Sequence, residues 1–399
     1  MSPRPTRPRR NLLRPGRRTV LVIAAIAPAV LVPITSGTAA GTAGPTNDRT
    51  LQRQIERFVS EPGGPPAVIA VLRDGKQTRV FRAGAADLAT GRPPHVNDHM
   101  RIASTAKAFS GAVALSLVDR GALRLDDTLR KRLPQLPDAW GRVTLRQLLH
   151  HTSGLPDYSQ SPEFVAELAA DPRHHFDSRR LLDYVADEPL LFAPGSRYAY
   201  SNSDNIAVAL MAEAVTATPY EQLLRRLVHR PLALRDTGLP QGYRMPEPYL
   251  HGYDVSDPAA AEDVSESVSA SGAWASGGIV STPLDMTRFI RGYAPGVLYG
   301  ERVVREQRRW IAGASVPAGP GRNAAGLAVF RYTTRCGVVL GHTGNFPGYT
   351  QLVAATPDGR RSLTFSLTSQ INEVGDPARL ERLRAVEENF VCALLRDGR

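Results

Sequence analysis

The chain has 399 residues and a formal charge of +11, and this length is ample for a large core and usually for more than one folding unit. Its composition is that of an ordinary globular protein. The positive charge does not indicate nucleic-acid binding, because seven arginines and no acidic residue fall within the first 40 residues. No basic run elsewhere is interleaved with aromatic residues, so no nucleic-acid partner is expected.

The first 40 residues have the order of an export signal. A basic segment, Arg4–Arg18, precedes an apolar stretch, Thr19–Ile34, and then small residues with cleavage expected after Ala40 or Ala43. The pair Arg9-Arg10 resembles a twin-arginine signal. An uncleaved membrane anchor is the alternative, but the apolar stretch is shorter than the ~20 residues of a membrane span. We therefore expect a secreted or cell-envelope protein with no stable membrane span in its mature form.

The next part of the chain predicts a helix followed by a hairpin. Residues 41–47 are a small, polar linker, and Asp48–Ser60 has apolar residues at helical spacing. Two apolar runs, Ala67–Leu72 and Thr78–Ala83, are separated by the turn residues Asp74-Gly75. They therefore predict two strands paired in a hairpin.

The middle of the chain, residues 98–311, has a pattern of helices and loops without a second clear hairpin. Its segment Ala106–Val118 is apolar on nearly every face, which predicts a buried helix ended by Gly121 in a left-handed conformation. Thr144 and Gln147 have the spacing of a capping box at the start of another helix.

Strands return near residue 326. Four short runs predict strands, at Leu327–Tyr332, Gly337–Leu340, Thr350–Ala355 and Ser362–Leu367. Ala378–Leu395 then has helical spacing. Strands at both ends of the chain imply an α+β fold, with one antiparallel sheet built from the two ends, flanked by terminal helices and interrupted by an all-helical domain. We divide the chain into an export signal (1–40), a linker (41–47), two parts of the α/β domain (48–97 and 312–399) and the helical domain (98–311).

Ser104 and Lys107 open the predicted buried helix. Free N–H groups and the helix dipole favour negative charge at the helix start, and residues three apart share one helical face. A hydroxyl beside a buried ammonium is one way to activate a serine, since the lysine can take its proton. A capping serine and a solvated lysine are the ordinary alternative. However, only three of the 49 basic residues are lysines. A lysine at this position therefore favours a catalytic role over that of an ordinary solvated side chain.

Tyr200 and Asn202 lie at the start of a second apolar helix, Ile206–Val215. A tyrosine beside the Lys107 ammonium has its phenolate favoured and can serve as a general base. Asn202 offers a donor and an acceptor to a substrate amide. Taken alone, both are also ordinary residues before a helix.

The stretch Gly341–Asn345 follows a predicted strand. Gly344 permits close approach of the backbone. The N–H of Asn345 can then pair with that of Ser104 as an oxyanion hole.

The motifs S-x-x-K, Y-x-N and H-T-G, in this order, resemble the serine acyl-transferases that act on penicillin, namely D-alanyl-D-alanine peptidases and class C β-lactamases. Gln147–Leu155, Ala193–Gly195 and Ser276–Thr282 are also similar to segments of this superfamily, and the resemblance covers about residues 48–399. It implies a β-lactamase/transpeptidase-like fold. A ligand cleft is expected between the two domains, because pockets often lie at domain boundaries. The resemblance also implies roles for particular residues: Ser104 is the nucleophile, Lys107 and Tyr200 handle its proton, and the substrate contacts are Asn202, His342, Thr343, Gly344 and Asn345.

Two departures refine the resemblance. His342 stands where β-lactamases of this class usually carry lysine, whereas the secreted D-alanyl-D-alanine carboxypeptidases have H-T-G. Cys336 and Cys392 also resemble the two cysteines of those carboxypeptidases. In an exported protein such a pair is a candidate disulfide, with free buried thiols as the alternative.

Other chemical patterns are weaker. The chain has no G-x-S-x-G, which argues against an α/β-hydrolase serine. The adjacent pairs His150-His151 and His174-His175 are poor chelators and no H-E-x-x-H occurs, so no metal and no other cofactor are expected. Ser203-Asp204-Asn205 matches a class A β-lactamase motif, but we interpret it as the first turn of a helix.

Recognition of a free carboxylate needs a positive charge in the cleft. The resembling carboxypeptidases supply an arginine on the strand that enters Cys336, and that position here is Phe330, followed by Arg331. Adjacent strand residues point to opposite faces, so Arg331 is expected to face away and carboxylate recognition to be weak.

The sequence thus predicts an exported serine hydrolase that forms an acyl-enzyme on Ser104 and is most similar to D-alanyl-D-alanine carboxypeptidases. An esterase, a D-amino-acid peptidase and a class C-type β-lactamase on the same scaffold are the alternatives. A non-catalytic penicillin-binding module is the alternative from a different class. The expected partner is a small peptide, ester or β-lactam substrate, with cell-wall peptide among the candidates.

Overall fold

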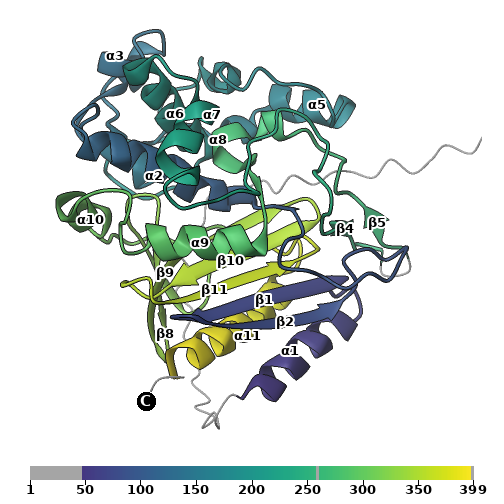
Figure 1. Cartoon of the computed structure of the whole chain (residues 1–399). Coiled ribbons are helices and arrows are strands. Elements are labelled where there is room, and N and C mark those ends of the chain that lie inside the picture. The colour runs from purple at the N-terminus through teal and green to yellow at the C-terminus, as the bar shows by residue number, and fades with distance from the viewer. Residues whose placement is uncertain (1–46, 258–259, 397–399) are drawn as a thin grey trace, which may run out of the picture.

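The computed structural model describes residues 47–257 and 260–396, and the predicted export signal lies outside them. Its centre is a seven-stranded antiparallel sheet in the order β2-β1-β11-β10-β9-β8-β7 (Figure 1). The strands are β1 (Ala67–Asp74), β2 (Gln77–Gly84), β7 (Arg322–Ala325), β8 (Phe330–Thr334), β9 (Gly337–Phe346), β10 (Tyr349–Ala355) and β11 (Arg361–Leu367). The predicted α+β fold is confirmed.

The two ends of the chain meet in the middle of this sheet. β1 pairs with β11 in the register Val68↔Leu367, and the predicted hairpin pairs Asp74 with Gln77. Gly75 in its turn has φ +53°, a conformation that glycine adopts without steric cost. The helical middle of the sequence is therefore an insertion into a sheet that its two flanks complete.

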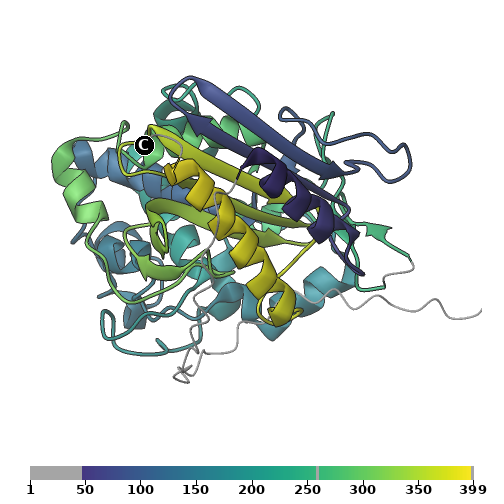
Figure 2. The ribbon, with the colours of Figure 1, turned by 90° about the horizontal axis from the view of Figure 1, so that it is seen from below.

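Helices α1 (Asp48–Ser60) and α11 (Pro377–Arg396) cover one face of the sheet, as the view from below shows (Figure 2). Their apolar faces pack on the apolar side chains of β1 and β11, and the rings of Phe81 and Phe365 contact Phe390 with centroids 5.3 and 5.2 Å apart. This apolar layer fixes both terminal helices to the sheet, since burial of such rings is the main source of packing energy.

The opposite face carries the helical lobe. Its helices are α2 (Ala106–Asp119), α3 (Leu129–Arg132), α4 (Leu145–Leu149), α5 (Pro162–Ala170), α6 (Asn202–Thr216), α7 (Tyr220–Leu224), α8 (Trp274–Gly277) and α10 (Glu301–Gln307). α2 is buried from Ala106 to Val118, and Gly121 has φ +73° as predicted. The predicted capping box of Thr144 and Gln147 is also present.

One helix of the predicted helical domain lies on the sheet instead. α9 (Pro283–Tyr293) packs against β11, β1 and β10, and its Thr287 hydroxyl is 3.0 Å from that of Thr364. The apolar side chains of α9 are buried by packing against the face of the sheet opposite α11. The division of the chain at residue 311 stays a prediction.

The short strands were not visible in the sequence. β3 (Met100–Arg101) pairs with β6 (Val280–Ser281), and β4 (Tyr253–Asp254) with β5 (Glu262–Asp263). Two-residue ladders are too short to show periodicity, and the pairing of β3 with β6 joins segments far apart in the chain. β8 also begins later than predicted, because Ala328 has φ +53° in a turn ahead of it.

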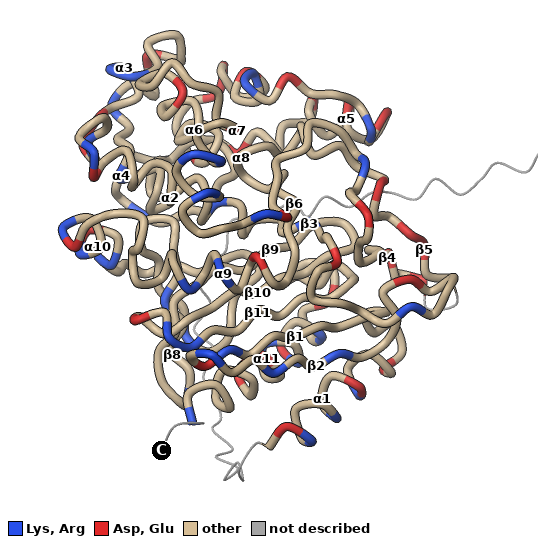
Figure 3. Tube along the Cα trace, in the orientation of Figure 1, with Lys and Arg blue, Asp and Glu red and all other residues tan. Residues whose placement is uncertain are grey.

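Basic and acidic residues are interspersed over both halves of the described chain in the view of Figure 3. Several form surface ion pairs, such as Arg79 with Asp48 and Arg335 with Glu388. Among residues 47–257 and 260–396, none of the helices combines the length and the apolar character that crossing a membrane requires.

A disulfide joins Cys336, in the turn between β8 and β9, to Cys392 in α11, with Cα atoms 5.1 Å apart. The link fastens the hairpin that carries His342–Asn345 to the helix beneath the sheet. It therefore fixes the position of β9 from the face opposite the helical lobe.

We predict that the cysteines are oxidised in protein isolated from an oxidising compartment, so that thiol titration finds no free thiol until a reductant is added. The closed segment spans 56 positions, so replacing both cysteines by serine should lower the free energy of unfolding by about 4 kcal/mol on the chain-entropy model. Two thiols that titrate in the native, unreduced protein would contradict this prediction.

Candidate active site

Ser104 lies in a 3₁₀ turn, Ala103–Thr105, that leads directly into α2. Ala103 has φ +51°, a strained conformation for a residue with a side chain, of the kind that clusters at functional sites. The N–H of Ile102 donates to the carbonyl of Ile279 at 3.1 Å, which ties this turn to the segment before β6. Ser104 is partly exposed between buried neighbours, and its own N–H is among those at a helix start that lack an intrahelical acceptor.

Lys107 is fully buried one helical turn after Ser104. Its Nζ donates to Ser104 Oγ at 3.1 Å, to Asn202 Oδ1 at 2.7 Å and to the Ser276 carbonyl at 2.8 Å. These three acceptors match the three hydrogens of an ammonium group. Burial lowers the pKa of Lys107 to about 7, against the opposing charge of Asp157. The neutral and the charged amine are therefore both accessible near neutral pH.

Tyr200 lies beside this amine. Lys107 Nζ is 4.9 Å from the centre of the Tyr200 ring, and the buried phenol oxygen has no hydrogen-bond partner among the described residues. Burial raises the pKa of Tyr200 well above its ordinary value. The expected phenolate is therefore not favoured, because loss of hydration outweighs the nearby ammonium. At neutral pH Tyr200 therefore keeps its proton.

A buried histidine–carboxyl pair packs against the Tyr200 ring. The His151 ring centroid is 4.5 Å from that of Tyr200. Its Nδ1 is 2.8 Å from Asp204 Oδ2, and Ser153 donates to the other oxygen of Asp204 at 2.5 Å. Burial raises the pKa of Asp204 and lowers that of His151 to about 3, so both groups favour their uncharged forms. Asp204 lies in the first turn of α6, as predicted for this motif.

Asn202 is held by two residues that the sequence did not single out. Its Nδ2 donates to Asp157 Oδ2 at 3.2 Å and to Ser159 Oγ at 2.9 Å. Both amide hydrogens are thus engaged within the protein, and Oδ1 is directed at Lys107. The predicted contact between Asn202 and a substrate amide stays a prediction. Asp157 also accepts from the Ser159 N–H at 3.0 Å, an ordinary turn interaction that gave no sequence signal of a role near Lys107.

β9 reaches Ser104 from the other side, and Gly344 makes this possible. A Cβ atom there would lie 2.4 Å from the Ile102 carbonyl oxygen and 3.1 Å from the Ala103 Cβ, so a side chain would push the strand away. β9 extends to Phe346, beyond the predicted Leu340, because β10 pairs with it from Leu340 to Phe346.

The main chain of Asn345 faces the free edge of β9. Phe346 and Tyr349 flank a two-residue turn, so their backbone groups bond across the hairpin and those of Asn345 point to the opposite edge. Pairing with β8 ends at Gly341, which leaves that edge open. The Asn345 side chain is occupied elsewhere, donating to Thr350 Oγ1 at 3.0 Å and to the Ile371 carbonyl at 2.7 Å.

His342 and Thr343 are both buried. Nδ1 of His342 lies 2.6 Å from the Thr343 carbonyl oxygen and must be the donor, since a carbonyl only accepts. Burial lowers the pKa of His342 to about 3, and the charge of Lys107 adds to this effect. The neutral ring therefore presents Nε2 as a buried acceptor without a partner among the described residues. The Thr343 hydroxyl donates to the Pro317 carbonyl at 2.6 Å and so anchors a loop.

Phe330 and Arg331 lie as the alternation of a strand requires. The Phe330 ring contacts the His342 ring edge-on, with centroids 5.0 Å apart. The Arg331 guanidinium lies 5.4 Å from the centre of the Trp310 ring. The apolar Phe330 ring, and not the Arg331 guanidinium, therefore lies against His342.

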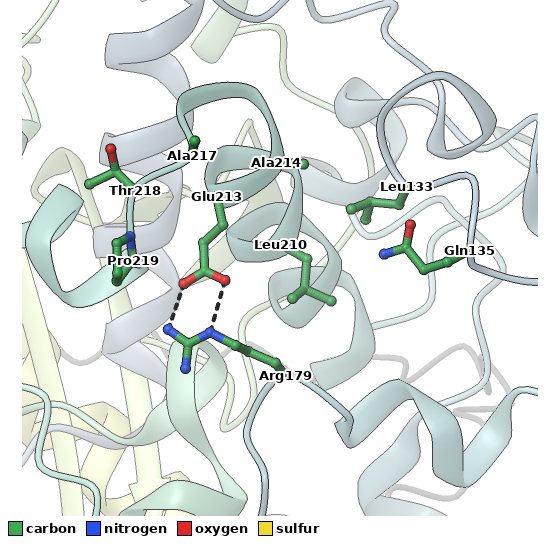
Figure 4. Close-up of a pocket in the computed structure, with 9 residues that line it drawn as sticks. All are labelled: Leu133, Gln135, Arg179, Leu210, Glu213, Ala214, Ala217, Thr218 and Pro219. Atoms are coloured by element: carbon green, nitrogen blue, oxygen red, sulfur yellow. Dashed lines mark hydrogen bonds and ion pairs between the residues drawn. The ribbon is translucent and has the colours of Figure 1, made fainter.

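Two surface hollows lie away from these residues. One, of about 360 Å³, is in the helical lobe, where Arg179 and Glu213 face each other as an ion pair (Figure 4). The other, of about 590 Å³, lies where α1 meets β2 and includes Arg53 and Phe81. Neither includes a residue around Ser104. Within the described part of the chain, no group of three or more His, Cys, Asp or Glu side chains is placed to hold a metal ion.

Comparison with known proteins agrees with this architecture. A family model described as Beta-lactamase matches residues 51–388. The chain is 26% identical over 296 residues to penicillin-binding protein 4* of Bacillus subtilis, covering 71% of this chain and 63% of that protein. It is 31% identical over 245 residues to the D-alanyl-D-alanine-carboxypeptidase/endopeptidase AmpH of Escherichia coli, covering 59% of each.

Among solved structures, a D-stereospecific amidohydrolase from a Streptomyces species is 28% identical and superposes with a TM-score of 0.72. The match covers 85% of this chain and 98% of that one. The two relatives matched by sequence are spanned over less than two thirds of their length, whereas the family model covers most of this chain. The chain belongs to the beta-lactamase family.

Proposed function

We propose that this protein is a serine hydrolase that forms an acyl-enzyme on Ser104. The observation that carries the proposal is the position of Lys107, whose buried Nζ lies 3.1 Å from Ser104 Oγ and whose pKa is lowered by burial to about 7. An amine that is partly neutral near pH 7 and within hydrogen-bond distance of a hydroxyl is a suitable general base.

In the proposed acylation step, neutral Lys107 takes the proton of Ser104 while Oγ attacks the substrate carbonyl. The carbonyl oxygen becomes an oxyanion, which the N–H groups of Ser104 and Asn345 stabilise. The proton then passes from the Lys107 ammonium to the leaving group, with the protonated Tyr200 hydroxyl as the relay. Expulsion of the leaving group gives the ester on Ser104. Water, deprotonated by the same groups, later hydrolyses this ester.

The proposed substrates are small D-configured peptides, amides or esters, with D-alanyl-D-alanine peptides and cell-wall fragments among them. The relatives described above, a D-alanyl-D-alanine-carboxypeptidase/endopeptidase and a D-stereospecific amidohydrolase, support this class. The neutral His342 and the apolar Phe330 beside it argue against a strong preference for a free carboxylate, because such recognition needs a cation. We also propose that residues 1–40 export the protein.

The first prediction concerns the nucleophile. Ser104→Ala should abolish covalent labelling by a fluorescent penicillin and all turnover, while Tyr200→Phe should slow acylation roughly 10²–10⁴-fold, as loss of an acid–base group does. Mass spectrometry of the labelled peptide identifies the attachment site. Stoichiometric labelling of Ser104→Ala at the same peptide would show that another residue is the nucleophile.

The second prediction is a pH dependence set by Lys107. Since its pKa is lowered to about 7, the amine is protonated and inactive as a base at lower pH. The logarithm of kcat/KM should therefore fall with a slope of about one per pH unit below about pH 7. Activity regained after return from pH 5 to pH 8 serves as the control for acid denaturation. A rate that stays constant down to pH 5 would exclude Lys107 as the base.

The third prediction separates the candidate substrates. We expect kcat/KM for a D-alanyl-D-alanine peptide and for its methyl ester to be of similar size, because the apolar Phe330 ring, and not the Arg331 guanidinium, lies against His342. Arg331→Ala should leave their ratio unchanged, since Arg331 faces Trp310. A strong preference for the free acid that is lost in Arg331→Ala would refute this substrate assignment.

A further inference from the structure

Asp157 occupies a place next to the proposed catalytic groups that neither the motifs nor the relatives' names assign. It lies in the loop between α4 and α5 and is partly exposed. Four donors converge on its two oxygens. Oδ1 accepts from the Ser159 N–H at 3.0 Å and its hydroxyl at 2.8 Å, and Oδ2 accepts from the Asn202 N–H at 3.0 Å and its Nδ2 at 3.2 Å. An ionised carboxylate only accepts hydrogen bonds, and its two oxygens can accept from four donors.

The first consequence is geometric. A carboxylate can only accept, so the Asn202 amide must turn its Nδ2 toward Asp157, and its Oδ1 is then the atom that meets Lys107 Nζ at 2.7 Å. A reversed amide would place Nδ2 against an ammonium, which has no acceptor to offer. Asp157 therefore fixes the orientation of the amide that positions Lys107.

The second consequence is electrostatic. The titratable side chains around Lys107 come from several elements: Asp157, His151, Tyr200, Asp204 and His342. Burial favours the neutral forms of His151, Tyr200, Asp204 and His342. Asp157 is the largest contributor among the charges that raise the pKa of Lys107. Among the described residues it forms no ion pair with a basic side chain, so its charge acts on Lys107 without a nearer cation.

We propose that Asp157 is a positioning residue for acylation, which orients Asn202 toward Lys107 and places a negative charge near its amine. This inference rests on the proposed function of Lys107 as the base. It assigns Asp157 and Asn202 to the alignment of the base, in place of the predicted contact between Asn202 and the substrate.

The test compares pH profiles of kcat/KM for a nitrophenyl ester. Asp157→Asn keeps an oxygen for the Ser159 N–H but loses the negative charge of the carboxylate. The acid limb of the profile, where kcat/KM falls as the pH decreases, should therefore move to lower pH. The plateau should fall roughly 10- to 100-fold, because the misoriented amide displaces Lys107. Ser159→Ala, the matched control, removes one acceptor of Asn202 and no charge. Its acid limb should coincide with that of the wild type, with a smaller fall of the plateau.

The inference is overturned if the acid limb of Asp157→Asn coincides with that of the wild type, or if Ser159→Ala moves it equally. If Asp157 had a merely structural role, its replacement would alter the melting temperature and the plateau value of kcat/KM, but not the pH at which the acid limb falls. If Asp157→Asn does not fold, Asp157→Ser provides a second neutral variant. Labelling of Ser104 in the wild type is measured first. Its absence would refute the proposed function, whereas normal labelling with an unmoved limb refutes this inference alone.

Discussion

The burial of one ammonium group governs the arrangement of the site. Lys107 is removed from water inside the helical lobe, and three oxygens at 2.7–3.1 Å replace its hydration. Burying a charge without such partners would cost far more than these contacts return, so each acceptor is held firmly. The three acceptors come from the 3₁₀ turn before α2, from the first residue of α6 and from α8, so that these elements meet at one amine.

The sheet brings the second half of the site to this amine. β9 lies against the turn that carries Ser104 because Gly344 has no side chain, and the edge of β9 that faces this turn is free beyond Gly341. The Cys336–Cys392 disulfide holds the same hairpin from below. The proposed oxyanion hole thus depends on the contact of Gly344 with the turn before α2, more than 200 positions away in the sequence, and on the Cys336–Cys392 link at the other face of the sheet.

Charge is distributed so that few ionised groups lie near the serine. Desolvation favours neutral Tyr200, His151, Asp204 and His342, which leaves Lys107 as the group whose protonation changes near neutral pH. The sequence-based assignment of Tyr200 as a phenolate base did not anticipate this, because it weighed the nearby ammonium without the loss of solvent. In a dry site the desolvation of the phenolate is the larger effect.

The amino-acid sequence determined the elements whose signals are local. Asp48–Ser60, the hairpin at Gly75, the buried helix after Ser104 and the capping box at Thr144 follow from periodicity, turn chemistry and capping, which act over a few residues. The spacing of Ser104 and Lys107 was likewise readable, since both lie on one helical turn. Only the tertiary structure decided the packing of α9 on the sheet, the roles of Asp157 and Ser276 around Lys107, and the pKa directions. These depend on burial and on contacts between distant segments, and no local pattern encodes how much water a folded site excludes.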